Sequence, residues 1–197
     1  MKRYSIRAVT PDFAWDAVPA APLLPCRWSP NPPPKAQMQA VWLPGEALVV
    51  RLRSFAVPTR AVNTAPDSAV WEDSCLEFFF SFDGRSYVNL EANAKGALRA
   101  AYGPDRNKRR FLREMEVPLP TAEAVEAEEG WELRLRLPLG LIPALWSVEA
   151  RPGLTFTGNF YSCGDATPAP HYAAWSPVET QTPDFHRPEF FGELIFA

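Results

Sequence analysis

Three carboxylates lie within a short part of the chain, at Asp73, Glu77 and Glu91. Around Glu77, hydrophobic residues occupy every second position over residues 76–82, which predicts a β-strand with one buried face. A turn signal at Asp83-Gly84 leads into a second alternating segment that contains Glu91. Glu77 and Glu91 therefore both fall on the non-core face of a predicted β-hairpin. Paired carboxylates on such a face can bind hydroxyl groups or perform acid–base chemistry.

The non-core face of this hairpin has an unusual composition for a surface exposed to water. Asn89 shares the parity of Glu91, and Trp71 continues the parity of Glu77 before the first strand. A solvent face would more often carry Lys, Thr and Ser. Three interpretations follow. The carboxylates pair with Arg99 or another arginine across the sheet, they bind a polar ligand, or they serve as the two carboxylates of a glycosidase.

Other catalytic and metal-binding patterns are absent from the sequence. It has no G-x-S-x-G, no C-x-x-C, no H-x-x-x-H and no glycine-rich phosphate loop. The cysteines Cys26, Cys75 and Cys163 are odd in number and widely spaced, so free thiols in a reducing compartment are expected. Cys75 and Cys163 fall in predicted strands, which favours small core residues over nucleophiles. Acidic residues in the loop 67–73 offer oxygen ligands for calcium, but without a recognised spacing.

Several further segments show the same two-residue alternation. The clearest covers residues 131–137, where tryptophan and leucine alternate with charged residues. Other predicted strands cover residues 4–9, 37–43, 47–55, 97–102, 155–163 and 189–196. Many short strands, 22 prolines and the lack of a long amphipathic helix indicate an all-β protein. We predict an antiparallel β-sandwich with jelly-roll or immunoglobulin-like layers and long Pro-rich loops.

The length of 197 residues fits a single domain, 1–197, in which residues 1–36 are predicted as an extended Pro-rich arm. The formal net charge is −3, so neither nucleic acid nor an anionic membrane is expected as a partner. The basic segment RNKRRFLR, residues 106–113, is interpreted as a solvated hairpin rather than a nucleic-acid patch. No apolar segment has the length of a signal-peptide core or a membrane span, so a cytoplasmic, bacterial-type protein is expected.

Two tryptophans outside the alternating core patterns favour a binding function. Trp71 precedes the first strand of the hairpin, and Trp175 lies in the Pro-bounded segment APHYAAWSP. Sugars pack their C–H faces on aromatic rings and direct their hydroxyl groups to planar donors and acceptors. Two indoles beside Glu77 and Arg99 would meet both needs. The alternative for each tryptophan is an anchor for its own loop.

Four sequence motifs extend this interpretation. VWEDSCLEFFFS and YVNLEANAKG form the hairpin, and NFYSCGD and HYAAWSPVETQTPDFHRPEFFGELIF lie toward the C-terminus. Together they resemble carbohydrate-binding module family 9 and its stand-alone bacterial relatives, over residues 37–196. The combination of Asp-Ser-x-x-Glu-Phe-Phe with Asp-Phe-His-x-Pro-x-x-Phe-Gly is fairly specific, whereas either motif alone is weak.

The resemblance implies a β-sandwich that holds a sugar between two tryptophans, at the positions of Trp71 and Trp175. It implies hydrogen bonds to sugar hydroxyls from Glu77 and, less directly, from Arg99. It also implies structural calcium, which the best-known members carry. Tyr172 stands where the family would present an amide side chain to the sugar.

Strand parity adds Asn89, Glu91 and Asn159 as further candidates for ligand contacts. The resulting hypothesis is a domain without enzyme activity that binds a mono- or oligosaccharide. Asp184 and His186, in the C-terminal loop, are interpreted as fastening that loop onto the sandwich.

Three other functions stay open at this point. Related sandwiches bind b-type haem, for which Met38, Met115 and His171 are the available ligands. An enzyme that acts on a glycoside would use Glu77 and Glu91. A structural or partner-binding domain would bury its tryptophans under loops or a second subunit.

Overall fold

The computed structural model describes residues 1–56 and 58–197. Its regular structure is almost entirely β-strand, with one short α-helix, α1 (Leu141–Trp146), and four single turns of 3-10 helix. The strands of the described residues are β1 (Arg3–Ala8), β2 (Ala21–Pro25), β3 (Ala36–Leu43), β4 (Ala47–Ser54), β5 (Cys75–Ser81), β6 (Tyr87–Asn93), β7 (Leu98–Gly103), β8 (Arg110–Phe111), β9 (Thr121–Ala127), β10 (Gly130–Pro138), β11 (Thr155–Cys163), β12 (Tyr172–Ala174) and β13 (Gly192–Phe196). The prediction of an all-β sandwich is confirmed.

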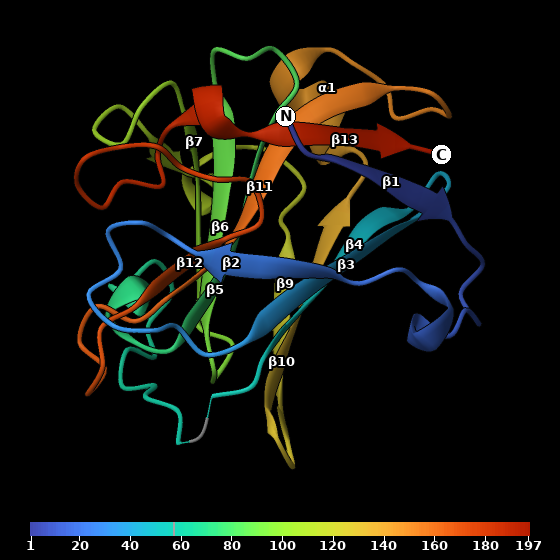
Figure 1. Cartoon of the computed structure of the whole chain (residues 1–197). Helices are drawn as coiled ribbons and strands as arrows, with labels where there is room; N and C mark the ends of the chain where they lie inside the picture. Colours follow the sequence, from blue (N-terminus) through green and yellow to red (C-terminus); the bar gives the residue numbers. More distant parts are fainter. Residues whose placement is uncertain (57) are drawn as a thin grey trace.

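The strands form two layers. One layer has the order β8-β7-β6-β5-β11, and β11 continues to β12 along one half and to β13 along the other. The second layer has the order β2-β3-β4-β10-β9. Nearly all neighbours are antiparallel. The exception is β1, which runs parallel to β13 and then to β3 and so joins the layers (Figure 1).

The predicted hairpin of residues 76–93 is formed by β5 and β6, at the centre of the first layer. Gly84 adopts a φ of 66° in the turn between them, a left-handed conformation that favours glycine. The Asp83 carboxylate accepts hydrogen bonds from the backbone N–H groups of Arg85 and Ser86, which stabilises the turn. This turn sets the register in which Glu77 faces Glu91.

The main core lies between the two layers, and the period-two alternation decides which side chains enter it. Phe78 of β5 stacks on Phe160 of β11, with 4.6 Å between ring centroids. Trp131, Leu133 and Leu135 of β10 contribute the opposing side. The predicted inward residues of β5, β6 and β10 are all buried there.

The opposite face of the first layer is buried as well. Every residue of β5 and β6 has little exposure, including the polar set around Glu77. A second apolar cluster covers this outer face and includes Phe79, Tyr161 and Phe185, the last from the long loop after β11. The predicted polar surface is therefore the inner wall of a covered site and not an open face.

Within residues 1–36, which are predicted as an extended arm, β1 corresponds to the predicted strand over residues 4–9 and pairs with β13 and β3. The short β2, which the sequence did not indicate, pairs with β3 in one layer and β12 in the other. In Figure 1 β2 crosses between the two layers. Among the described residues, no helix has the length and apolar character needed to cross a membrane.

Candidate functional site

A cavity of about 400 Å³ opens on the outer face of the first layer. Its volume lies in the range of small-molecule sites. Its lining combines aromatic rings with charged groups of both signs: Trp28, Trp71, Glu77, Glu91, Arg99, Arg106, Arg109, Cys163, Asp165, Tyr172, Pro183, Asp184, Phe185 and His186. Of the eight residues predicted from the sequence to contact ligand, five line this cavity: Trp71, Glu77, Glu91, Arg99 and Tyr172.

Glu77 and Glu91 form the base of the cavity. They are cross-strand partners on β5 and β6, and each residue is only 3% exposed. Burial raises the pKa of Glu77 well above its usual value, and the negative charge of Glu91 raises it further. Burial also raises the pKa of Glu91, but the charges of Arg99 and Arg109 oppose that rise. Glu77 is therefore the carboxyl group more readily protonated.

Arg109 is held beside Glu91 by a short chain of hydrogen bonds. Its Nη1 donates to Asn89 Oδ1 at 2.6 Å and lies 3.9 Å from Glu91 Oε1. Asn89 Nδ2 in turn donates to Glu91 Oε1 at 2.7 Å. Asn89 is fully buried and positions the two charged groups instead of lining the cavity, so its predicted role as a ligand contact is wrong.

Most of the basic segment 106–113 is exposed, and its β8 pairs with β7, as the interpretation as a solvated hairpin expects. Two of its arginines have a further role: the Arg109 side chain is 9% exposed, and both Arg106 and Arg109 line the cavity. The Arg109 partner, Glu91, belongs to another strand, so no pattern within the segment reveals it. An arginine beside a buried glutamate supplies donors that are already oriented for a polar ligand.

Trp71 lies in a 3-10 turn (Val70–Glu72) at the edge of the cavity. The Arg99 guanidinium lies over its ring, 4.9 Å from the centroid, and at the same distance from the Phe111 ring. Arg99 Nη1 also donates to the Asp67 carbonyl oxygen at 2.6 Å. These contacts hold Arg99 in place and stabilise the orientation of the indole.

A second aromatic group comes from the N-terminal segment and the C-terminal loop. Trp28 packs edge-on against Tyr172, with centroids 5.0 Å apart, and against Phe185 at 5.6 Å. The Trp28 Nε1 atom is buried without a hydrogen-bond partner among the described residues. The sequence reasoning missed Trp28, because a lone tryptophan between prolines carries no periodic signal.

The loop bearing Asp184 and His186 is fastened to β6. His186 Nδ1 and the Tyr87 hydroxyl lie 2.9 Å apart, and Asp184 Oδ1 accepts from the His186 N–H at 3.0 Å. Burial lowers the pKa of His186 to about 2, and the nearby arginines act in the same direction. The imidazole is therefore neutral. The His186 contact with Tyr87 agrees with the predicted fastening of the loop, whereas the Asp184 bond to His186 is local to the loop. Both residues line the cavity as well.

Trp175 does not belong to the site, so the predicted pair of stacking tryptophans is wrong. It is 2% exposed in the main core, where it packs edge-on against Phe160 at 5.7 Å. The reason is strand parity. β12 directs Tyr172 toward the cavity and Ala173 toward the core, and Trp175 continues the inward set. Small residues in YAAW hide this alternation in the sequence.

Asn159 also has a structural role. Its Oδ1 accepts from the Ser176 N–H at 2.8 Å and its Nδ2 donates to the Ser176 carbonyl at 2.9 Å. The residue is fully buried and does not line the cavity. Its predicted ligand contact is therefore wrong. Asn159 instead satisfies the backbone N–H and carbonyl groups of Ser176, in the segment after β12.

Three of the residues named for haem or calcium, Met38, His171 and Asp73, have structural contacts. Met38 is fully buried in the core, and His171 Nδ1 lies 2.9 Å from the Ala169 carbonyl oxygen; neither lines the cavity. The Asp73 carboxylate accepts hydrogen bonds from the Arg60 guanidinium and from the backbone N–H groups of residues 62 and 63. A carboxylate surrounded by donors does not fit calcium, which requires oxygen ligands.

Comparisons with a family model and with solved structures both find carbohydrate-binding proteins. The model of the carbohydrate-binding family 9 matches residues 27–196. A protein from Bacteroides uniformis, provisionally described as carbohydrate-binding, is 27% identical with a TM-score of 0.82, over 100% of this chain and 99% of that chain. A carbohydrate binding module family 9 from Caldicellulosiruptor kristjanssonii shares the fold at 15% identity and a TM-score of 0.68. One structure of that module is in complex with glucose, and the match covers 100% of this chain and 96% of that chain. Another is in complex with cellotriose, and the match covers 99% and 93%. No curated protein matches the chain.

Proposed function

This chain belongs to carbohydrate-binding family 9, and from that premise we propose that it binds a carbohydrate, without chemical change, in the cavity above Glu77 and Glu91. The observation that carries the proposal is the composition of the cavity. It places an indole, Trp71, at the edge of a space whose base is two buried carboxylates. Aromatic rings match the C–H faces of a sugar, and fixed charged groups match its hydroxyls.

Each side of the ligand has a matching group. Trp71 provides the stacking surface, and Trp28 provides a buried indole N–H without a protein acceptor. Glu77 and Glu91 accept hydrogen bonds from hydroxyls, while the arginines donate to hydroxyl oxygens. Tyr172, on the strand that pairs with β11, adds a further ring and hydroxyl. The cavity lining therefore contains both donors and acceptors, which the hydroxyls of a sugar require.

The stacking energy sets the expected affinity. If a sugar covers half of one indole, it removes about 75–125 Å² of apolar surface from water, which contributes about 2–3 kcal/mol. Hydrogen bonds to charged groups contribute about 1.5–3 kcal/mol each, and association costs at least about 4 kcal/mol. The balance corresponds to micromolar to millimolar dissociation constants.

Calorimetric titration with glucose, cellobiose, cellotriose and a panel of other mono- and disaccharides tests the proposal. We expect saturable binding for at least one sugar class. The Trp71→Ala variant should lose about 30- to 150-fold in affinity, which corresponds to the 2–3 kcal/mol above. Trp15→Ala is the matched control, because Trp15 contacts Phe13 and Arg51 outside the cavity. Equal binding by Trp71→Ala and wild type would contradict the assignment of the cavity.

The non-catalytic part of the proposal has its own test. Incubation with aryl glycosides and with any oligosaccharide that binds should release no product. Turnover that is lost in Glu77→Gln would refute non-catalytic binding and would assign the carboxylate pair to glycoside hydrolysis.

A further inference from the structure

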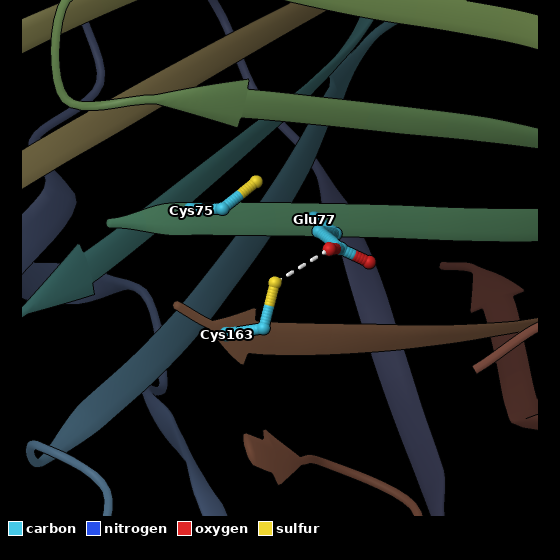
Figure 2. A group of neighbouring side chains, drawn as sticks. All are labelled: Cys75, Glu77 and Cys163. Carbon is cyan, nitrogen blue, oxygen red and sulfur yellow. Dashed lines mark hydrogen bonds between the residues drawn. The ribbon is translucent and has the colours of Figure 1, made fainter. Parts of the chain in front are cut away.

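Figure 2 shows two thiols and a carboxylate close together, from Cys75, Glu77 and Cys163. Cys75 on β5 and Cys163 on β11 are direct cross-strand partners, and Glu77 follows Cys75 by two residues on the same face. One ligand atom from each of the three residues lies within 4.8 Å of the others. The Cys163 Sγ donates to Glu77 Oε1 at 3.0 Å.

The spacing of this group fits a small cation. A tetrahedral zinc ion has Zn–S distances of about 2.3 Å and Zn–O distances of about 2.0–2.2 Å, which separates its ligand atoms by roughly 3.3–3.8 Å. Cys163 Sγ and Glu77 Oε1 lie 3.0 Å apart, and all three donor atoms lie within 4.8 Å of one another, a range that includes these values. Cys75 is the first residue of β5 and Cys163 is the last residue of β11, and the two strands pair directly at these positions. The backbone therefore brings the two thiols together without a loop that must close.

The group also lacks a positive charge. Among the residues that the structure describes, no cation forms an ion pair with Glu77, because Arg109 lies beside Glu91. Cys75, Glu77 and Cys163 are all buried. Three acidic groups thus share one buried place, where a divalent cation would stabilise their ionised forms.

From this geometry we infer that Cys75, Glu77 and Cys163 form a binding site for a thiophilic divalent cation, zinc above all. Thiolates exclude the hard cations calcium and magnesium, while a carboxylate ligand disfavours copper(I) relative to zinc. Glu77 and Cys163 line the cavity, whereas Cys75 lies below it. The fourth position of the ion would therefore face the cavity and stay open to water or to a bound molecule.

Cobalt(II) is the probe for the first experiment, because it replaces zinc in tetrahedral sites and absorbs light. The reduced, metal-free full chain is titrated with cobalt(II) in the absence of sugar, and zinc is then added. We expect one equivalent of cobalt to bind, with thiolate-to-metal charge-transfer absorption that zinc abolishes. Because no sugar is present, failure here leaves the carbohydrate titration unaffected, and the two proposals fail independently.

The third cysteine supplies the matched control. Cys26 is also buried on the outer side of the first layer but is not one of the three donors. We expect Cys26→Ser to bind cobalt as wild type does. Cys75→Ser and Cys163→Ser should each lose about half of the charge-transfer intensity and at least tenfold in affinity. Glu77→Gln should bind more weakly and keep the charge-transfer absorption at saturation.

X-ray absorption of the zinc-loaded wild-type chain gives a test that needs no variant to fold. A shell with two sulfur atoms at about 2.3 Å and lighter atoms at about 2.0 Å supports the site. A shell without sulfur, no charge-transfer absorption in the fully reduced wild type, or an unchanged spectrum in both Cys75→Ser and Cys163→Ser overturns it.

Discussion

Glu77 on β5 and Glu91 on β6 stand directly opposite each other, and both are buried at the base of one cavity. Like charges directly opposite across a sheet are destabilising. Glu91 has two arginine neighbours: Arg99 is its cross-strand neighbour on β7, and Arg109 lies 3.9 Å away, whereas no ion pair is formed by Glu77 among the described residues. The pair is therefore asymmetric, with a protonation-prone Glu77 and a more readily ionised Glu91. This asymmetry has a consequence for the dependence of stability on pH.

Glu77→Gln should become more stabilising relative to wild type as the pH rises. Folding raises the pKa of Glu77, so the folded state binds its proton more tightly than the unfolded state. The stabilisation that protonation gives the wild type is complete below the unfolded pKa, near 4.5, and is lost as the pH rises toward the folded pKa. Each unit by which folding raises this pKa corresponds to about 1.4 kcal/mol, or about 3–6 °C in Tm. Melting curves of both chains from pH 4 to 9 measure the difference. A Tm difference that stays constant over this range would exclude the raised pKa.

Trp175→Ala should act on stability. Trp175 is buried between the layers, and removal of a buried tryptophan side chain costs about 3–5 kcal/mol. Chemical denaturation measures this loss. Trp71→Ala is the comparison, since Trp71 lies at the cavity edge and should lose much less free energy of unfolding. If Trp175→Ala keeps wild-type stability but loses sugar binding, the tryptophan is part of the site after all.

Arg109→Ala should destabilise the chain by about 3–5 kcal/mol, because it removes one of the two arginines that neutralise the buried Glu91 carboxylate and leaves Asn89 Oδ1 without its donor. The adjacent Arg110 is exposed and donates to the Glu114 carbonyl, so Arg110→Ala is a matched control with a change below about 0.5 kcal/mol. In the double variant Arg109→Ala/Glu91→Gln much of the loss should be recovered. Additive effects in this double-mutant cycle would show that the two groups do not interact.

Removal of calcium should leave the stability unchanged. Arg60 and backbone N–H groups, with the Asn93 side chain, already occupy the acceptor positions of the Asp73 carboxylate. Melting curves with a chelator and with added calcium should agree within about 1 °C. Arg60→Ala, in contrast, should lower the free energy of unfolding by about 3–5 kcal/mol, since it leaves a buried charge unpaired. A chelator-dependent fall in Tm of the wild type would show that a calcium site exists elsewhere.

Much of the site was predictable from the sequence, because strand periodicity is a local property. The alternation over residues 76–93 and the Asp83-Gly84 turn are enough to put Glu77 and Glu91 on one face of one hairpin. The same parity places Cys75 beside Glu77 and assigns Phe78 to the core. A side chain in a regular strand can point only to one of two faces, so its neighbours in the sequence determine the choice.

What covers each face was decided by tertiary structure. The outer face of β5 could have been open to water, but the loop bearing Asp184 and His186 covers it, and Trp28 arrives there from the N-terminal segment. Trp71 and Trp175 look alike in the sequence, yet the pairing of β12 with β11 turns Trp175 into the core. Arg109 becomes a buried partner of Glu91 only because the chain returns across β7. These positions depend on contacts between segments far apart in the chain, and periodicity within one segment carries no information about them.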